Sequence, residues 1–273
     1  MRRRILPGLP LSLGLTLVYV SIIIVLPLGA LIFKAASLGP EDYWRIVSSD
    51  RAVASYSVTV LCALGATLFN LIFGMALAWV LVRYRFPGRR LLDAVVDLPF
   101  ALPTAVAGIA LTTLFASNGW FGAALGGIGI KVAYTPLGIM IAIAFTSLPF
   151  IVRTVQPVLE ELDPALEEAG QTLGGSDLSI FTRVILPLLA PALLAGVSLS
   201  FARSLGEFGA IIFIAGNQPF ETEITALLAF IRLEEYDYPA SAAIASVMLL
   251  AAFLMLAITN LLQARALRYS ERG

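Results

Sequence analysis

Long apolar stretches separated by shorter polar segments recur along the whole chain. Several of them reach the ~20 apolar residues that a helix needs to cross a bilayer. We predict six transmembrane helices, at residues 9–33, 56–82, 94–115, 135–152, 188–214 and 239–263. The expected fold class is an all-α polytopic membrane protein, with residues 1–273 as a single transmembrane domain.

The longest polar interruption, Asp163–Pro187, predicts two short helices that protrude between two spans. Asp163 is a favourable N-cap and Pro164 a favourable first helical residue, while Gly174 tolerates the positive φ that often ends a helix. Ser176 is placed to cap the second helix. A protruding pair of helices of this kind suits contact with another protein. One face of the second helix carries Leu178, Phe181 and Ile185.

Two prolines four residues apart, Pro99 and Pro103, interrupt the third predicted span. Each removes a backbone donor and kinks a helix. Freed carbonyl groups need partners, so such a break lies inside a bundle or beside a water-filled path. Transporters place broken helices near the substrate route. Both interpretations stay open, a kink that only serves packing and a segment of the translocation path.

The fifth predicted span combines small residues with an embedded pair of charges. Small residues at every fourth position let helices approach closely, within the subunit or at a dimer interface. Arg203 and Glu207 are four residues apart, and an isolated charge at mid-membrane costs about 2.5–3.5 kcal/mol. We therefore expect them to pair with each other or to face a polar cavity, where Arg203 would help an anion to pass. The small residues are Ala192, Gly196, Ser200 and Ser204.

Composition narrows the class further. The chain is 59% hydrophobic and 13% charged, whereas soluble domains carry about 25% charge. The formal net charge is zero, so no general attraction to nucleic acid is expected. The chain has one cysteine, Cys62, and no histidine. The lack of histidine removes the commonest general base and the commonest metal ligand. We expect no catalytic residue and no metal site.

The distribution of arginines predicts the orientation. Most lie in the N-terminal segment, the 83–90 turn, the 153–187 region and the C-terminal segment, which the positive-inside rule places in the cytoplasm. Both termini are then cytoplasmic, and so is the Asp163–Pro187 segment. The arginines of the 83–90 turn are a positive-inside signal or contact anionic lipid head groups. Arg89 is spaced to pair with Asp93.

The Asp163–Pro187 segment also carries a family resemblance. Glu168-Ala169-Gly170, then Gly174, then Val184-Ile185-Leu186-Pro187 resembles the EAA loop of ABC importer permeases. Gly170 and Val184 stand where that family usually has alanine and isoleucine. In the family this loop, here about residues 157–187, is the coupling helix that docks on the cytoplasmic ATPase. The resemblance assigns that contact to Glu167, Glu168, Ala169, Gly170, Gly174, Leu186 and Pro187.

A second segment narrows the resemblance. Phe201–Gly209, with the sequence FARSLGEFG, followed by Ile214–Asn217 and Thr222–Ile224, is similar to the sulfate/thiosulfate permease subunits of ABC importers, of the T type. Related molybdate permeases share its core. The resemblance implies the type I importer fold in a bacterial inner membrane. The implied partners are membrane lipid, a second, usually different permease, an ABC ATPase dimer and a periplasmic sulfate-binding protein.

The expected function is therefore ATP-driven import of sulfate or thiosulfate. The chain has no Walker motif, so it is not itself an enzyme and needs no cofactor, while ATP and Mg would be bound by the ATPase subunits. The outer loop Ala215–Tyr238, with Asn217 and Glu223, is the candidate contact for the binding protein. Replacing Glu168 or Gly174 is expected to uncouple hydrolysis from transport. The candidate translocation path comprises Pro99, Pro103, Arg203, Ser204 and Glu207.

Alternative functions remain at this stage. A molybdate or tungstate permease fits the same motifs, because the anions are alike in charge and size. A secondary anion transporter would need an ion or proton site, for which Glu207 and Asp97 offer little. A membrane enzyme lacks the usual histidine-based constellation, and a purely structural subunit leaves the protruding helices unexplained.

Overall fold

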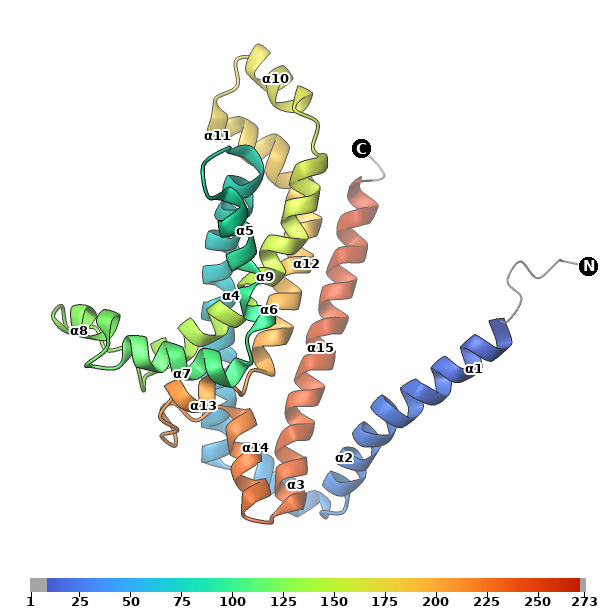
Figure 1. Cartoon of the computed structure of the whole chain (residues 1–273). Coiled ribbons are helices and arrows are strands. Elements are labelled where there is room, and N and C mark those ends of the chain that lie inside the picture. Colours follow the sequence, from blue (N-terminus) through green and yellow to red (C-terminus); the bar gives the residue numbers. More distant parts are fainter. Residues whose placement is uncertain (1–8, 271–273) are drawn as a thin grey trace, which may run out of the picture.

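The computed structural model describes residues 9–270, which form helices joined by short loops, with no strand among them (Figure 1). Five helices within this part of the chain are long and apolar enough to cross a membrane. They correspond to the first, second, fourth, fifth and sixth predicted spans. The spans are Leu11–Ala36, Asp50–Arg83, Pro136–Glu161, Asp177–Leu205 and Tyr238–Thr259.

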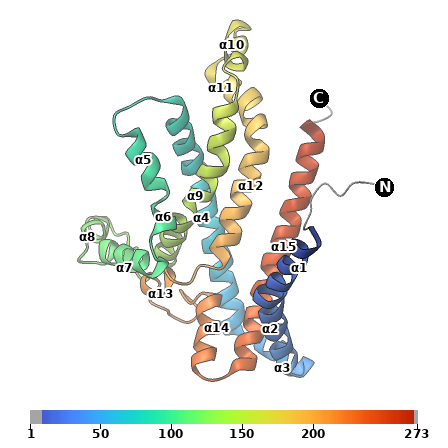
Figure 2. The same ribbon diagram turned by 45° about the vertical axis from the view of Figure 1, so that its right-hand side comes forward.

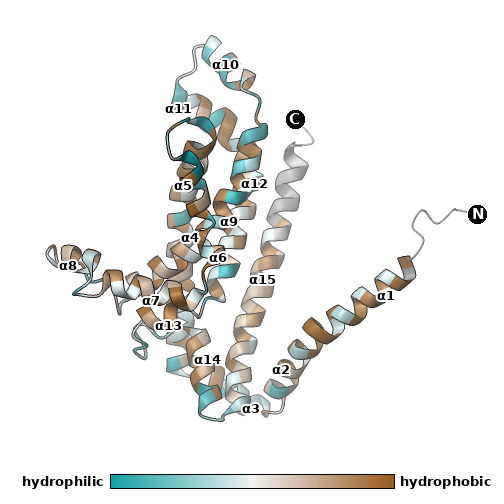
Figure 3. Ribbon diagram, in the orientation of Figure 1, coloured by the Kyte–Doolittle hydropathy of each residue, from teal (hydrophilic) through white to brown (hydrophobic). Residues whose placement is uncertain are grey.

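The first span consists of α1 (Leu9–Val20), a π-helical turn and α2 (Leu26–Ala36). Helix α2 packs against α15 (Tyr238–Ser270), whereas α1 runs away from the bundle (Figure 1). The span is mostly apolar, with a few polar residues among the apolar ones (Figure 3). Its exposed surface therefore suits lipid or another membrane helix.

The core is organised around α9 (Pro136–Glu161), which packs against α4 (Asp50–Arg83) and α12 (Leu186–Leu205). Close packing depends on glycine, because a Cβ on Gly196 would lie 3.1 Å from the Ile151 Cα. The small-residue pattern of the fifth span therefore serves packing within the subunit at this position. Helix α9 extends beyond residue 152, where we expected the fourth span to end, and continues through Pro149 and Pro157.

The prediction of a single helix over residues 94–115 is wrong. The segment forms α5 (Arg89–Val96), α6 (Leu98–Ala101) and α7 (Thr104–Phe115). The chain is extended at Leu102, and Pro103 has no N–H to continue α6. Helix α7 turns away from the direction of α5 and, with α8 (Trp120–Gly126), projects from the side of the bundle in both views (Figures 1 and 2).

The fifth predicted span ends earlier at its C-terminal end than expected. Helix α12 stops at Leu205, and residues 206–210 form a turn before α13 (Ile211–Ile214). Glu207 therefore lies just beyond the helix that carries Arg203. The fifth span begins earlier than expected, because α11 (Asp177–Ile180) and a π-helical turn continue into α12. The remaining short helices are α3 (Pro40–Val47), α10 (Ala165–Thr172) and α14 (Thr225–Glu234).

Candidate coupling and translocation sites

Helices α10 and α11 form the hairpin that the polar segment predicts, and it protrudes at one end of the bundle (Figure 1). Asp163 Oδ1 accepts a hydrogen bond from the Ala165 N–H at 2.9 Å, and Ser176 Oγ accepts one from the Ser179 N–H at 3.3 Å. Gly174 has a φ of 79°, the left-handed conformation expected at the end of α10. Local capping therefore shapes this hairpin, which we call the coupling hairpin.

The two glutamates of the coupling hairpin face different surroundings. Glu168 is exposed, together with Ala169 and Gly174. The Glu167 carboxylate instead accepts a hydrogen bond from the Arg83 guanidinium, at the end of α4, and forms an ion pair with it. Glu168 is thus available to a partner protein, while Glu167 attaches the hairpin to this chain.

The other residues assigned to ATPase contact divide in the same way. Gly170 is half-buried, and a Cβ there would lie 2.9 Å from Ile180 Cγ1, so it allows α10 to pack on α11. Leu186 is half-buried at the start of α12 and Pro187 is exposed. The hairpin therefore offers one exposed face and one face that packs on its own chain.

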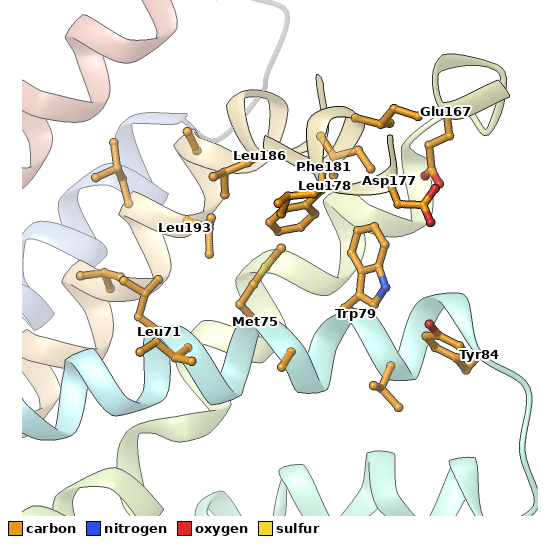
Figure 4. A pocket seen from close by; sticks show the side chains of 18 of the residues that line it. Leu71, Met75, Trp79, Tyr84, Glu167, Asp177, Leu178, Phe181, Leu186 and Leu193 are labelled. Carbon is orange, nitrogen blue, oxygen red and sulfur yellow. The ribbon is translucent and has the colours of Figure 1, made fainter. Parts of the chain in front are cut away.

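Aromatic contacts reinforce the attachment of the hairpin to α4. The Arg83 guanidinium lies 5.5 Å from the Trp79 ring centroid, and Trp79 meets Phe181 edge to face at 5.6 Å. Trp79 and Phe181 line an apolar groove of about 1440 Å³ between α4 and α12 (Figure 4). Glu167 and Asp177 lie at the hairpin end of the groove. The hairpin is therefore attached to α4 through these side chains, and it continues through a π-helical turn into α12.

Arg203 and Glu207 pair, as their spacing predicts, with 2.8 Å between Arg203 Nη2 and Glu207 Oε2. The Glu207 side chain is 1% exposed, and its Oε1 accepts a hydrogen bond from the Ala210 N–H at 3.0 Å. The Arg203 side chain is 36% exposed. The carboxylate thus fixes the turn after α12, whereas the guanidinium keeps N–H groups toward accessible space.

The broken third segment packs against this turn. A Cβ on Gly108 would lie 2.8 Å from the Ala210 Cα, and one on Gly209 would lie 3.1 Å from the Thr104 Cβ. The structure therefore brings the first turn of α7, immediately after Pro103, next to the turn held by Glu207. That end of α7 has no side-chain cap, so its N–H groups add to the local positive potential.

Ser204 does not line an open path in this structure. Its side chain is buried, and Oγ donates to the Ser200 carbonyl at 2.6 Å. In this structure Ser204 is part of the buried face of α12, and its role in the path stays a prediction. Ser200 is also fully buried.

The loop Ala215–Tyr238 corrects a second expectation. Glu223 is 1% exposed, and both of its carboxylate oxygens accept hydrogen bonds from Arg51, at 2.8 and 2.6 Å. A side chain held in this way anchors the loop to the start of α4 and does not offer a contact surface. Asn217 has a φ of 50° and a buried Oδ1 without a partner, while Phe220 is exposed with a φ of 70°. The exposed parts of the loop are therefore residues 218–221, around Phe220, and residues 233–238, around Tyr236.

An arginine that the sequence did not single out joins α5 to α9. Arg153 binds both Asp93 and Asp97, so Asp93 is not paired with Arg89 as its spacing suggested. We call Arg153, Asp93 and Asp97 the arginine clamp. The distance of 56 residues between Asp97 and Arg153 explains why no local pattern indicated it.

Comparison with known proteins shows which family the chain belongs to. The profile of the family "Binding-protein-dependent transport system inner membrane component" matches residues 70–268. The sulfate transport system permease protein CysT of Salmonella typhimurium is 58% identical over 263 residues, 96% of this chain and 95% of the relative. The CysT protein of Synechocystis sp. is 48% identical over 256 residues, 94% and 90% of the two chains.

Solved structures agree on the fold. A chain of a bacterial ABC transporter involved in the import of the acidic polysaccharide alginate superposes with a TM-score of 0.77 at 18% identity, covering 94% of this chain and 95% of that chain. A chain of the MetNI methionine ABC transporter gives a TM-score of 0.62 at 15% identity, with 84% and 99% covered. The predicted all-α importer permease fold of type I is confirmed. The chain therefore belongs to the family of binding-protein-dependent transport system inner membrane components, the permeases of ABC importers.

Proposed function

We propose that this chain is the transmembrane permease subunit of an ATP-driven importer that carries sulfate or thiosulfate into the cytoplasm. The observation that carries the proposal is the 58% identity to a sulfate transport permease over nearly the whole of both chains. The Arg203–Glu207 turn supports it, because the guanidinium is partly exposed and the turn itself packs on the uncapped N-terminus of α7, and both features favour an anion. Molybdate or tungstate is the second candidate cargo, since the same features suit any small divalent oxyanion.

The proposed partners follow from the two ends of the bundle. The coupling hairpin and the arginine-rich turn before α5 lie at the same end, which we assign to the cytoplasm (Figure 1). An ABC ATPase dimer would bind there and hold ATP and Mg, with Glu168 among the contacts. The opposite end, with α13 and α14, would face a periplasmic sulfate-binding protein, and a second, related permease would complete the path. The chain itself would lie in a bacterial inner membrane with both termini in the cytoplasm.

A mechanism follows from the continuity of the helices. When the ATPase dimer closes on ATP, it moves the coupling hairpin, which lies between α9 and α12 and is paired to α4 through Arg83 and Glu167. Helices α4, α9 and α12 then tilt and open the path toward the binding protein. Hydrolysis returns the inward-facing state. The binding protein supplies affinity and most of the selectivity, so the permease needs only weak contacts with the anion.

Uptake of labelled sulfate into proteoliposomes tests the function. They would contain this chain with its copurifying partners and the binding protein, with and without ATP on the ATPase side. We expect uptake that requires ATP and that excess thiosulfate, but not molybdate, inhibits. ATP-dependent molybdate uptake without sulfate uptake would move the assignment to the second cargo. Uptake that does not require ATP would overturn the assignment as an ATP-driven importer.

The conformation of Gly174 gives a test of the coupling hairpin. A β-branched residue is strained at a φ of 79°, so Gly174→Val is expected to destabilise the hairpin by about 1–3 kcal/mol. The amount of ATPase that copurifies with the permease should fall. Gly174→Asn is the matched control, because asparagine tolerates the left-handed region and should retain most of the ATPase. Equal retention by both variants would contradict a role for this conformation in docking.

A further inference from the structure

The arginine clamp is the main polar connection between α5 and the helix bundle. Arg153 Nε donates to Asp97 Oδ1 and Nη2 to Asp97 Oδ2, both at 2.7 Å. Nη1 donates to Asp93 Oδ1 at 2.6 Å, and Nη2 also reaches the Asp93 carbonyl at 2.9 Å. Four donor contacts thus fix α5 at one height on α9. Val96 is the one residue of α5 that is fully buried, so apolar packing holds this helix weakly.

The clamp lies between the coupling hairpin and the break in the third segment. From Arg153, α9 continues without interruption to Glu161, close to the start of α10. Along this stretch Gln156 accepts from Arg153 at 2.6 Å and donates to Glu160 at 3.3 Å. On the other side, Asp97 immediately precedes α6 and the Leu102–Pro103 break.

The two halves of the third segment are attached to different parts of the molecule. Helix α6 is attached to α9, because Phe100 meets Phe150 edge to face at 5.3 Å, one helical turn from Arg153. Helix α7 also touches α9, but its main contact is with α13 and the turn before it, where Gly108 meets Ala210. The break at Leu102–Pro103 therefore separates a half attached to the coupling side from a half attached mainly to the outer side.

We propose that Arg153 is a positioning residue that transmits displacement of the coupling hairpin to the third segment, with Leu102–Pro103 as the hinge. The inference rests on the proposed function and adds to it the residue that links the ATPase side to the candidate path. A guanidinium that binds two carboxylates has a defined direction, so it moves α5 together with α9. Asp93 and Asp97 are 41% and 50% exposed, so the clamp contributes little to stability compared with a buried ion pair.

The first experiment measures sulfate transported per ATP hydrolysed by the reconstituted complex. Arg153→Gln and the double variant Asp93→Asn/Asp97→Asn are each expected to lower this ratio about fivefold or more, with ATP hydrolysis retained. Arg153→Lys keeps the charge without the planar fork and should be intermediate. Asp42→Asn, in the exposed Arg45–Asp42 pair on α3, is the matched control and should keep the wild-type ratio. A wild-type ratio in both clamp variants would overturn the proposal.

A second experiment does not depend on the cargo. Pairs of spin labels on cysteines, in a Cys62→Ala background, report distances between helices with and without trapped ATP. The exposed positions Leu91 on α5, Glu161 on α9 and Ile109 on α7 can carry them. We expect the Leu91–Glu161 distance to stay constant while the Leu91–Ile109 distance changes. A change in the Leu91–Glu161 distance would overturn the proposed role of the clamp. Failure of ATP-driven uptake in the wild type would overturn the proposed function alone.

Discussion

Replacing Gly108 with alanine is expected to abolish most transport, because the added Cβ has no space. It would lie 2.8 Å from the Cα and 2.9 Å from the carbonyl carbon of Ala210, which are backbone atoms and not a side chain that can rotate. The Ala210 segment cannot yield easily, since Glu207 holds its N–H and Arg203 holds Glu207. Overpacking of this kind costs about 1–3 kcal/mol. The measurements are sulfate uptake and unfolding of the purified permease in detergent.

Gly126 at the end of α8 provides the matched control for this substitution. A Cβ there meets nothing within 4 Å, and the backbone conformation accepts an L-residue. Gly126→Ala should therefore leave uptake and stability close to those of the wild type, or raise stability slightly through better helix propensity. If Gly108→Ala transported as well as Gly126→Ala, the contact between α7 and the turn after α12 would not matter for the path.

The features that the sequence predicted well depend on neighbouring residues. Asp163, Gly174 and Ser176 each act within a few positions, and the coupling hairpin has the capping that they indicate. The long helices follow in the same way from continuous apolar runs. Local signals of this kind do not need knowledge of which helices meet.

The third and fifth spans show where apolar length misleads. Residues 94–115 have the length of a span, and the prolines predicted a kink, but hydropathy cannot say that α7 turns aside. What decides this is the contact of Gly108 with Ala210, which is distant in sequence. The end of α12 was missed for a different reason, because hydropathy does not register the turn after Leu205, which a local hydrogen bond from the Ala210 N–H to the buried Glu207 carboxylate stabilises.

The ion pairs show the same difference between residues that are close in sequence and residues that are distant. Arg203 and Glu207 are four residues apart, and their pairing was predicted from spacing. Arg51 and Glu223 are separated by 172 positions, so the sequence left Glu223 as a surface candidate. Only the packing of the loop that carries Glu223 on the start of α4 reveals that its side chain is buried.

Replacing Arg51 with methionine is expected to lower the free energy of unfolding by about 3–5 kcal/mol, because it leaves the Glu223 carboxylate buried without its cation. Glu223 is 1% exposed and depends on Arg51 for bonds to both oxygens, at 2.8 and 2.6 Å. The exposed Arg45–Asp42 pair on α3 is the control, and Arg45→Gln should cost less than about 1 kcal/mol. Detergent denaturation of the purified permease measures both values.

The double variant Arg51→Met/Glu223→Met separates the ion pair from the loop that it holds. Removing both partners eliminates the uncompensated charge, so the double variant should recover most of the stability that Arg51→Met loses. Uptake driven by the binding protein should nevertheless stay below the wild-type level, since two flexible methionines do not fix the outer loop as a bidentate pair does. A double variant less stable than Arg51→Met would mean that the guanidinium acts mainly through its packing, and that the buried carboxylate is stabilised by other groups.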